Sequence, residues 1–423
     1  MSRMPLALLL LILFSAPLLR SQPAAPPPAT NFDAVAATNA YLATVPADKK
    51  ARSDAYFEGG YWLILWDFLY GASVALLLLS TRLSSRMRSL SERLTRFRPL
   101  RTFAYWVQYL LATTALTFPL TVYEGFVREN QYGLATQTFA PWLGDQLKSL
   151  ALGLLLGGLA VTALFGIVRR LPRTWHLWGA VAGLALTALF TMIFPVFIAP
   201  LFNQYIKLTD PTVRDPILSL ARANGIPATE VYEVDASRQS TRISANVSGF
   251  MGTERITLND NLLKRSTLPE IMSVMGHEMG HYVLNHVYKG LLFTLIVLVV
   301  FFAGLRRALD WSLARWGARW EIRGVSDPAV LPLAVLIVSI FSFLYTPIGN
   351  TVTRTMEYEA DMYGLNAVRQ PDAFATIALK LGEYRKLNPG PVEEMLLFDH
   401  PSGRTRIYSA MRWKAGNLNA RIP

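Results

Sequence analysis

The chain has 423 residues, 52% of them hydrophobic, and a mean hydropathy of +0.29; with apolar runs near the length of a bilayer crossing, this is not the composition of a soluble protein. It contains no cysteine, which excludes disulfides, thiolate metal ligands and a cysteine nucleophile. The net charge of +12 would suit nucleic-acid binding, but the arginines gather in short loops between apolar runs, as in membrane proteins.

The N-terminal residues 1–22 have the pattern of a signal peptide. Arg3 is followed by the leucine-rich run Pro5–Leu19 and then by small residues. The same run can instead be a first membrane helix, although it is short for one, and the sequence leaves both alternatives open. Residues 23–58 are predicted to be a polar linker segment that begins with the proline-rich stretch Pro23–Pro28.

Six further apolar runs are predicted to be membrane helices, which makes seven with the N-terminal run. Four lie in residues 59–202 and two in residues 290–350; they are Tyr61–Ser80, Phe103–Tyr123, Leu147–Val168, Leu177–Phe202, Gly290–Leu305 and Leu331–Pro347. Prolines in or near these runs predict kinks or helix ends, at Pro119, Pro195, Pro200 and Pro347.

Basic residues mark one face of this membrane region. The loop Arg82–Arg101 carries seven arginines against the single acid Glu92, and further arginine clusters follow the third and fifth of the six runs. Counted along the chain, these loops share one face, which the positive-inside rule makes cytoplasmic. Residues 203–289 and 351–423 then lie on the extracytoplasmic face. If the arginines are only solvated or bind acidic lipid, the orientation is the same.

Residues 203–289 are predicted to form a small α+β domain. Asp210–Asn224 has helical periodicity, whereas Thr229–Val234 and Arg255–Leu258 have the composition of strands. The polar segment Ala236–Gly252 between them is expected to be a loop or hairpin. A strand beside the helix that follows can present an exposed edge to an extended peptide.

That helix carries the motif His277-Glu278-Met279-Gly280-His281, or H-E-x-x-H. Residues four apart share a helix face, so His277 and His281 can bind one metal ion, while Glu278 reaches a metal-bound water. Thr267 and Glu270 form a capping-box pattern at its start. The alternative is a chance motif on a solvated face. It is disfavoured because three of the five histidines lie within ten residues of one another, between apolar side chains.

A second set of candidate ligands follows the last membrane run. Continuing that run as a helix places Glu357 and Asp361 on one face, on the same side of the membrane as the motif. Two histidines and a glutamate are a known ligand set for catalytic zinc, so one Zn²⁺ per chain is predicted at His277, His281 and Glu357. Asp361 suits an acceptor that orients a ligating histidine, and Glu359 is expected to point elsewhere. The alternative is a solvated acidic face above the membrane.

The C-terminal sequence His400-Pro401-Ser402-Gly403-Arg404-Thr405-Arg406 adds a histidine close to two arginines. A histidine or arginine beside a zinc ion can stabilise an oxyanion or bind a peptide carboxylate. His400 and Arg406 are therefore candidate catalytic residues. The alternative is a surface histidine before a turn. His286 is rotated off the ligand face and is expected to have a supporting or structural role.

Together these motifs resemble the membrane zinc metallopeptidases of family M48, typified by the eukaryotic type I CAAX prenyl protease. The resemblance runs from Tyr61 to Ile407 and rests on the H-E-x-x-H helix with the following Asn285-His286, the Glu357–Asp361 segment, Ile198–Phe202, Arg255–Leu258, and His400-Pro401 with Arg406. It implies a mainly α, polytopic membrane barrel of six to seven helices that encloses a chamber, and a small zincin-like α+β domain. It also implies zinc at His277, His281 and Glu357, with Glu278 as general base and His400 and Arg406 lining the substrate site.

One position departs from the family pattern. Where the family has an Asn-Ala dipeptide near the substrate-binding strand, this chain has Ser244-Ala245, and Asn246 follows. The polar contact with the substrate is expected from Ser244 or Asn246; the alternative is that the substrate preference differs from that of the family. The signal-like N-terminus and the charge pattern indicate a bacterial inner-membrane protein, which puts prenylated substrates in question.

The sequence thus predicts a zinc-dependent endopeptidase for peptides or membrane-associated proteins, lipidated or membrane-inserted ones included, and not for nucleic acid. A broad quality-control protease for membrane proteins is the alternative within enzymes. A transporter would need ionisable groups inside the spans, and Asp67 is one of few candidates. A scaffold with an inert site would have lost a ligand or Glu278, and none is missing.

Overall fold

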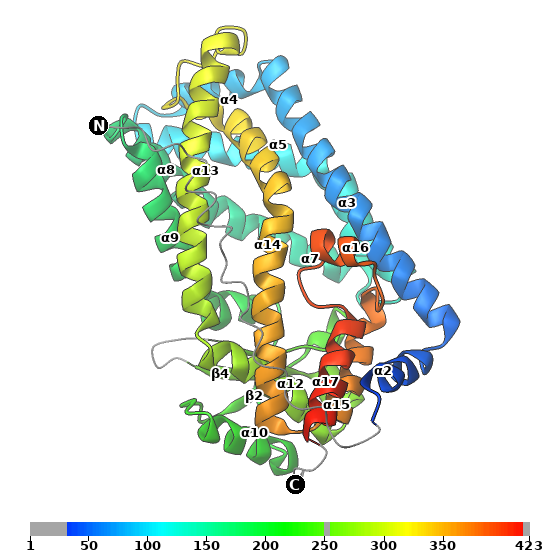
Figure 1. Cartoon of the computed structure of the whole chain (residues 1–423). Helices are drawn as coiled ribbons and strands as arrows, with labels where there is room; N and C mark the ends of the chain where they lie inside the picture. The colour runs from blue at the N-terminus through cyan, green and yellow to red at the C-terminus, as the bar shows by residue number, and fades with distance from the viewer. Residues whose placement is uncertain (1–31, 249–253, 418–423) are drawn as a thin grey trace, which may run out of the picture.

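The computed structural model describes residues 32–248 and 254–417 and is mainly helical (Figure 1). The predicted signal peptide or first membrane helix, residues 1–22, lies outside the described residues. The α-helices are α2 (Ala34–Ala43), α3 (Ala47–Ser80), α4 (Leu83–Leu94), α5 (Arg98–Val122), α6 (Glu129–Gln131), α7 (Phe139–Leu152), α8 (Gly158–Arg170), α9 (Trp175–Ile193), α10 (Pro211–Ala223), α11 (Asp260–Arg265), α12 (Leu268–Val283), α13 (His286–Trp316), α14 (Leu331–Val368), α15 (Pro371–Leu381), α16 (Pro391–Leu397) and α17 (Gly403–Asn417).

Within the described residues, six helical segments are long and apolar enough to cross a membrane. They are Ala47–Ser80, Arg98–Gln131, Phe139–Arg170, Trp175–Leu201, His286–Trp316 and Pro328–Val368. Each contains or largely overlaps one of the predicted runs, so the prediction of a mainly α membrane barrel with six described spans is confirmed. The described part of the predicted linker forms α2 and the first turns of α3. The chamber that the resemblance implies stays a prediction.

Proline and irregular turns shape these long helices. Pro119 lies inside α5, which passes into the π-helical turn η1 (Tyr123–Arg128). Pro195 lies in the π-helical turn η3 (Phe194–Ile198), which follows the end of α9. Because proline has no N–H to donate to the preceding turn, helices widen or end at these points. The remaining irregular turns are η2 (Gly153–Gly157), η4 (Ala199–Leu201), η5 (Ala236–Arg238), η6 (Pro328–Val330) and η7 (Gly382–Tyr384).

A four-stranded sheet lies at the end of the molecule that also holds α10 and α12 (Figure 1). Its order is β1-β2-β4-β3, with β2 and β4 parallel and the outer strands antiparallel. The strands are β1 (Tyr205–Lys207), β2 (Val231–Val234), β3 (Ala245–Ser248) and β4 (Arg255–Asn259). The polar segment predicted to be a loop or hairpin therefore supplies the edge strand β3. The small α+β domain is confirmed.

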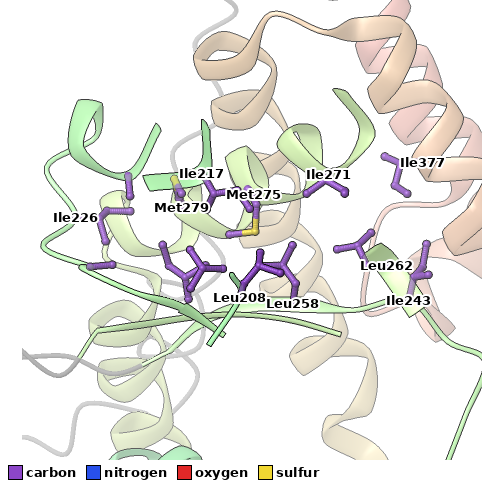
Figure 2. Close-up of a cluster of buried hydrophobic side chains, with 14 residues drawn as sticks. Leu208, Ile217, Ile226, Ile243, Leu258, Leu262, Ile271, Met275, Met279 and Ile377 are labelled. Atoms are coloured by element: carbon purple, nitrogen blue, oxygen red, sulfur yellow. The ribbon is translucent and has the colours of Figure 1, made fainter. Parts of the chain in front are cut away.

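Helix α12 packs on one face of this sheet. Figure 2 shows Met275 and Met279 of α12 among Ile217 of α10 and Leu258 of β4, and all four side chains are fully buried. Burying each such side chain stabilises the fold by about 1.5–3 kcal/mol. This core fixes the position of the helix that carries the H-E-x-x-H motif, and it leaves the histidine face of α12 turned toward α14.

Glycines let α12 and α14 approach each other closely. A Cβ atom added at Gly364 would lie 2.8 Å from the backbone nitrogen of His277, and one added at Gly280 would lie 3.1 Å from the Cα of Ala360. Backbone atoms cannot move aside as a flexible side chain can, so Gly364 requires glycine, and a Cβ at Gly280 would be tightly crowded. The close contact brings the C-terminal half of α14 beside the two histidines.

We therefore expect Gly364→Ala to destabilise the protein by about 1–3 kcal/mol through overpacking and to lower its metal content. Gly290→Ala is the matched control, because a Cβ at that position would have no described atom within 4 Å apart from its chain neighbours and the backbone of its own helix. Thermal unfolding and metal analysis of the two purified variants check this. Equal midpoints for both variants would show that the helix contact tolerates a methyl group.

Candidate metal centre

A capping box starts the helix that carries the candidate ligands. The Thr267 N–H donates to Oε2 of Glu270 at 2.7 Å, and Nζ of Lys380 in α15 donates to the same oxygen at 2.7 Å. Burial opposes ionisation of Glu270, but these hydrogen bonds outweigh it and hold the pKa of the carboxyl below its usual 4.5. The cap thus anchors α12 to α15 through a buried carboxylate.

Replacing Glu270 by glutamine is expected to lower the free energy of unfolding by about 1–3 kcal/mol at neutral pH. Because the folded-state pKa is depressed, the carboxylate's contribution is fully present above the unfolded value of 4.5 and is lost as pH falls through the lower folded value. Thermal midpoints of wild type and Glu270→Gln, measured between about pH 7 and about pH 3, should therefore converge at the acidic end. A gap that stays constant across this range would contradict an ionised Glu270.

Two imidazole nitrogens and one carboxylate converge between α12 and α14. The Nε2 atoms of His277 and His281 are 3.2 Å apart. Glu357 places Oε2 3.3 Å from Nε2 of His277 and Oε1 3.4 Å from Nε2 of His281. All three donor atoms lie within 4.8 Å of one another. The structure therefore brings together the donor atoms of the three predicted metal ligands.

Asp361 contacts the Nδ1 side of the His277 ring, and Arg406 in turn binds Asp361. Oδ1 of Asp361 lies 2.7 Å from Nδ1 of His277, and the aspartate is only 1% exposed. Arg406 in α17 donates to this carboxylate from Nε at 2.9 Å and from Nη2 at 2.5 Å. An Nδ1–H held by Asp361 leaves Nε2 of His277 free for a metal. Arg406, a predicted catalytic residue, thus binds Asp361, and its guanidinium also lies over the ring of Phe374, 5.3 Å from the ring centroid.

The second histidine is supported by His286, for which the sequence predicted a supporting or structural role. Nδ1 of His286 lies 2.9 Å from Nδ1 of His281, and Nε2 of His286 lies 3.0 Å from Glu359. Asn285 makes this possible by taking a left-handed backbone conformation with φ 57°, which turns the chain between α12 and α13. Glu359, which was expected to point elsewhere, thus reaches His281 through His286. Asn285 was the available signal in the sequence, because asparagine is one of the few residues that adopt the left-handed conformation readily.

Electrostatics favour a cation at the centre of this cluster. Burial alone would lower the pKa of His277, yet its contacts with Asp361 and Glu357 raise it to about 10. Burial and the neighbouring His277 lower the pKa of His281 to about 4, so that this ring is neutral and has a lone pair for a metal. One cation, a proton or a metal ion, is thus stabilised among the three donor groups.

Glu278 lies in a cavity of about 180 Å³ that also holds His277, Glu357, His400 and Arg406. Burial raises the pKa of its carboxyl to about 7, which is close to the value a general base needs near neutral pH. The arrangement can therefore bind a metal ion and hold a basic carboxylate beside it.

His400 enters the same cavity from the segment before α17. Its Nε2 lies 3.4 Å from Oε2 of Glu357, and its Nδ1 lies 2.8 Å from Oδ1 of Asp399. Asp399 was not among the sequence candidates, although a carboxylate next to a candidate histidine was a visible signal. A carboxylate that accepts from Nδ1–H fixes the ring orientation and directs Nε2 into the site.

The two candidate substrate-binding residues separate in space. Ser244 precedes the edge strand β3 and lines the cavity that holds Glu278. Asn246 lies in β3 and lines a different cavity, with Phe190 and Arg255. Among the alternatives that the sequence left open, the structure thus brings only Ser244 to the candidate metal centre.

Two family models match the chain. The model described as "Peptidase family M48" matches residues 207–414, which include the three candidate ligands and Glu278. The model described as "CAAX prenyl protease N-terminal, five membrane helices" matches residues 35–204, which include α3 to α9. The two matches follow each other along the chain and together cover most of its length.

Individual proteins and one solved structure are also similar. The uncharacterized metalloprotease YhfN of Bacillus subtilis is 31% identical over 335 residues, which are 79% of this chain and 78% of that protein. CAAX prenyl protease 1 of Saccharomyces cerevisiae is 28% identical over 311 residues, 70% of this chain and 68% of that protein. The crystal structure of S. mikatae Ste24p matches with a TM-score of 0.75 and 23% identity over 89% of this chain and 95% of that chain, so the fold is shared.

Proposed function

The chain belongs to peptidase family M48, and on that premise we propose that it is a zinc-dependent endopeptidase with Glu278 as its general base. As a family member it is a multi-pass membrane metallopeptidase that acts on peptides or proteins. One observation carries the proposal: the donor atoms of His277, His281 and Glu357 converge at one point, with the Glu278 carboxyl in the same cavity.

The donor set fits zinc. Two imidazoles and one carboxylate hold catalytic zinc in several known metallopeptidases and leave a position for water. Asp361 and His286 occupy the Nδ1 atoms of His277 and His281, so each Nε2 is left for the metal. Iron and manganese bind the same donor groups, so metal analysis of the purified protein has to identify the bound ion.

When bound, zinc acidifies water and polarises the scissile carbonyl. In the proposed mechanism Glu278 takes the proton of the attacking water and passes it to the leaving amine. Asp399 accepts the Nδ1–H of His400, and when the second ring nitrogen is also protonated, Nε2 donates to the oxyanion that develops on the substrate. Arg406 lines the cavity and holds Asp361, which in turn fixes the ring of His277.

An extended peptide is the substrate form that the site supports. Strand β3 lies at the edge of the sheet and pairs on one side with β4, so its other side can pair with a peptide backbone. Ser244, at the start of this edge, is the residue that we propose contacts the substrate. The cavity also has apolar walls, formed by Leu262, Val274, Phe374, Ile377 and Leu381, which suit an apolar side chain next to the cleaved bond. Peptides and membrane-associated proteins, lipidated ones included, meet this description.

The proposed orientation places the metal centre outside the cytoplasm of a bacterial inner membrane. Helix α4, from the arginine-rich segment, lies at the end of the molecule opposite α12 (Figure 1). Positive loops are retained on the cytoplasmic face. Protease accessibility of the α4 segment and the α12 segment in sealed inverted and right-side-out vesicles can check the assignment, since the two segments should be cleaved from opposite sides.

Metal removal is the direct test of the proposed activity. Purified wild type in detergent should contain close to one zinc ion per chain and cleave peptide. Treatment with a chelator should abolish cleavage, and zinc should restore it while magnesium does not, because Mg²⁺ prefers oxygen ligands. Metal analysis alongside a fluorogenic peptide assay measures both quantities. Cleavage by protein that carries no transition metal would refute the proposal.

A further inference from the structure

Another cavity lies at the far end of the membrane helices, away from the metal centre. Its volume is about 200 Å³, and we call it the arginine cavity because five arginines from four parts of the chain line it: Arg88, Arg98, Arg101, Arg169 and Arg323. They come from α4, the start of α5, the end of α8 and the loop before α14. None of these residues has a part in the proposed peptidase mechanism.

Its charges do not balance. Two acids line the cavity, and each already has a partner: Asp327 binds Nη1 of Arg88 at 2.7 Å, and Glu92 binds Nη1 of Arg323 at 2.6 Å. Across residues 32–248 and 254–417, no carboxylate oxygen lies within 4.0 Å of the guanidinium groups of the other three arginines, Arg98, Arg101 and Arg169. Five positive charges against two negative ones leave three uncompensated around one cavity.

A buried donor at the cavity also lacks an acceptor. Arg88 is only 7% exposed, and its Nη1 donates to Asp327 and to the backbone oxygen of Glu321. Its Nε–H has no hydrogen-bond partner among the described residues. Buried N–H groups are nearly always satisfied, so the unpaired Nε–H of Arg88 adds to the local excess of donors over acceptors beside the cavity.

The position of the cavity matches the depth of lipid headgroups. Arg98 and Arg101 lie in the first turn of the membrane span that begins at Arg98, and Arg169 lies in the last turn of the span that ends at Arg170. The start of α5 also presents the positive end of its helix dipole. Arginine binds phosphate oxygens with two parallel N–H donors. A phosphate at this depth would meet guanidinium groups from several helices.

We propose that the arginine cavity binds a phosphate group, supplied by the headgroup of an anionic phospholipid. The phosphate oxygens accept hydrogen bonds from Arg98, Arg101 and Arg169, the three arginines without a carboxylate partner in the described part of the chain. Such a ligand joins α4, α5, α8 and the loop before α14 at one point, and so stabilises the membrane region.

The experiment measures lipid and anion binding by the full-length protein in neutral detergent. Short-chain phosphatidylglycerol, short-chain phosphatidylcholine and inorganic phosphate are titrated separately at constant ionic strength, with thermal midpoint and native mass spectrometry as readouts. We expect phosphatidylglycerol to raise the midpoint and to remain bound as one molecule per chain, and phosphatidylcholine to do neither.

Charge-matched variants separate the cavity from the general basic surface. R98Q/R101Q/R169Q removes three cavity arginines, whereas R86Q/R93Q/R96Q removes three exposed arginines of the same segment that do not line the cavity. If each cavity arginine contributes about fivefold, the first triple variant should weaken phosphatidylglycerol binding by roughly a hundredfold and the second only slightly. If the first triple variant fails to fold, R101Q alone provides the same comparison with R96Q.

The outcomes are distinct. Binding of phosphatidylglycerol in preference to inorganic phosphate identifies a lipid site, and comparable binding of both identifies the phosphate group itself as the ligand and overturns the lipid source. Equal loss of binding in the two triple variants would overturn the proposal, because the effect would then be one of surface charge. No binding of any anion by wild type would overturn it as well.

Discussion

Glu278→Gln is expected to abolish peptide cleavage and to leave the metal content unchanged. Glutamine has almost the same shape as glutamate but cannot accept the proton of the attacking water, and general-base catalysis of this kind contributes about 10²–10⁴-fold to the rate. The metal should remain because the converging donors belong to His277, His281 and Glu357. Metal analysis and a peptide cleavage assay on the same preparation measure both effects.

A suitable control is Glu230→Gln, since Glu230 is an exposed residue whose ion pair is with Lys207 on the surface of the same domain. This variant should keep full activity. A Glu278→Gln protein that still cleaves peptide would show that another group takes the proton. Loss of zinc from that variant would instead show that Glu278 is a ligand, and the assignment of Glu357 would have to be revised.

The periodicity of a single helix was sufficient to predict the parts of the site that lie within one helix. His277 and His281 share a face of α12 because they are four residues apart, and the same spacing places Glu357 and Asp361 on one face of α14. The prediction for Glu357 and Asp361 depends on the last membrane run continuing as one helix, and α14 does continue to Val368. The chain pattern therefore indicated both halves of the site.

Tertiary contacts bring the two halves of the site together, and the periodicity of the sequence does not predict these contacts. The contact of Gly276 and Gly280 with Ala360 and Gly364 depends on how two helices cross. The link from Glu359 to His281 depends on the left-handed turn at Asn285, which rotates His286 back toward the site. The sequence left the segment that contains β3 open between a loop and a hairpin, because its polar residues have little of the β-branched or aromatic character that marks strands, and the structure shows the hairpin with β4.

The arginine-rich segment shows the same limit at the opposite end of the molecule. Its charge pattern predicted one face of the membrane region, because loop charges are read directly from the sequence. The pattern did not predict a cavity, since Arg98, Arg169 and Arg323 come from different helices and loops that meet only in the folded protein.

Asp361→Asn is expected to have the second large effect, on stability and on metal affinity together. The carboxylate of Asp361 is buried between His277 and Arg406. Removing its charge leaves the Arg406 guanidinium without its ion-pair partner, and breaking a buried pair in this way costs about 3–5 kcal/mol. Loss of the carboxylate behind a metal-binding histidine should also weaken metal binding by about 10–100-fold.

Thermal unfolding of the metal-free protein measures the first effect, and zinc competition with a chromophoric chelator measures the second. Asp215→Asn, at an exposed aspartate beside Arg214, is the control and should change neither quantity. The double variant Asp361→Asn/Arg406→Gln should be less destabilised than the sum of the two single variants, by about 0.5–3 kcal/mol, because it removes both partners of the buried pair. Additive effects would mean that Arg406 does not depend on Asp361 for its charge balance. Its main role would then be in the substrate site, as the family resemblance implies.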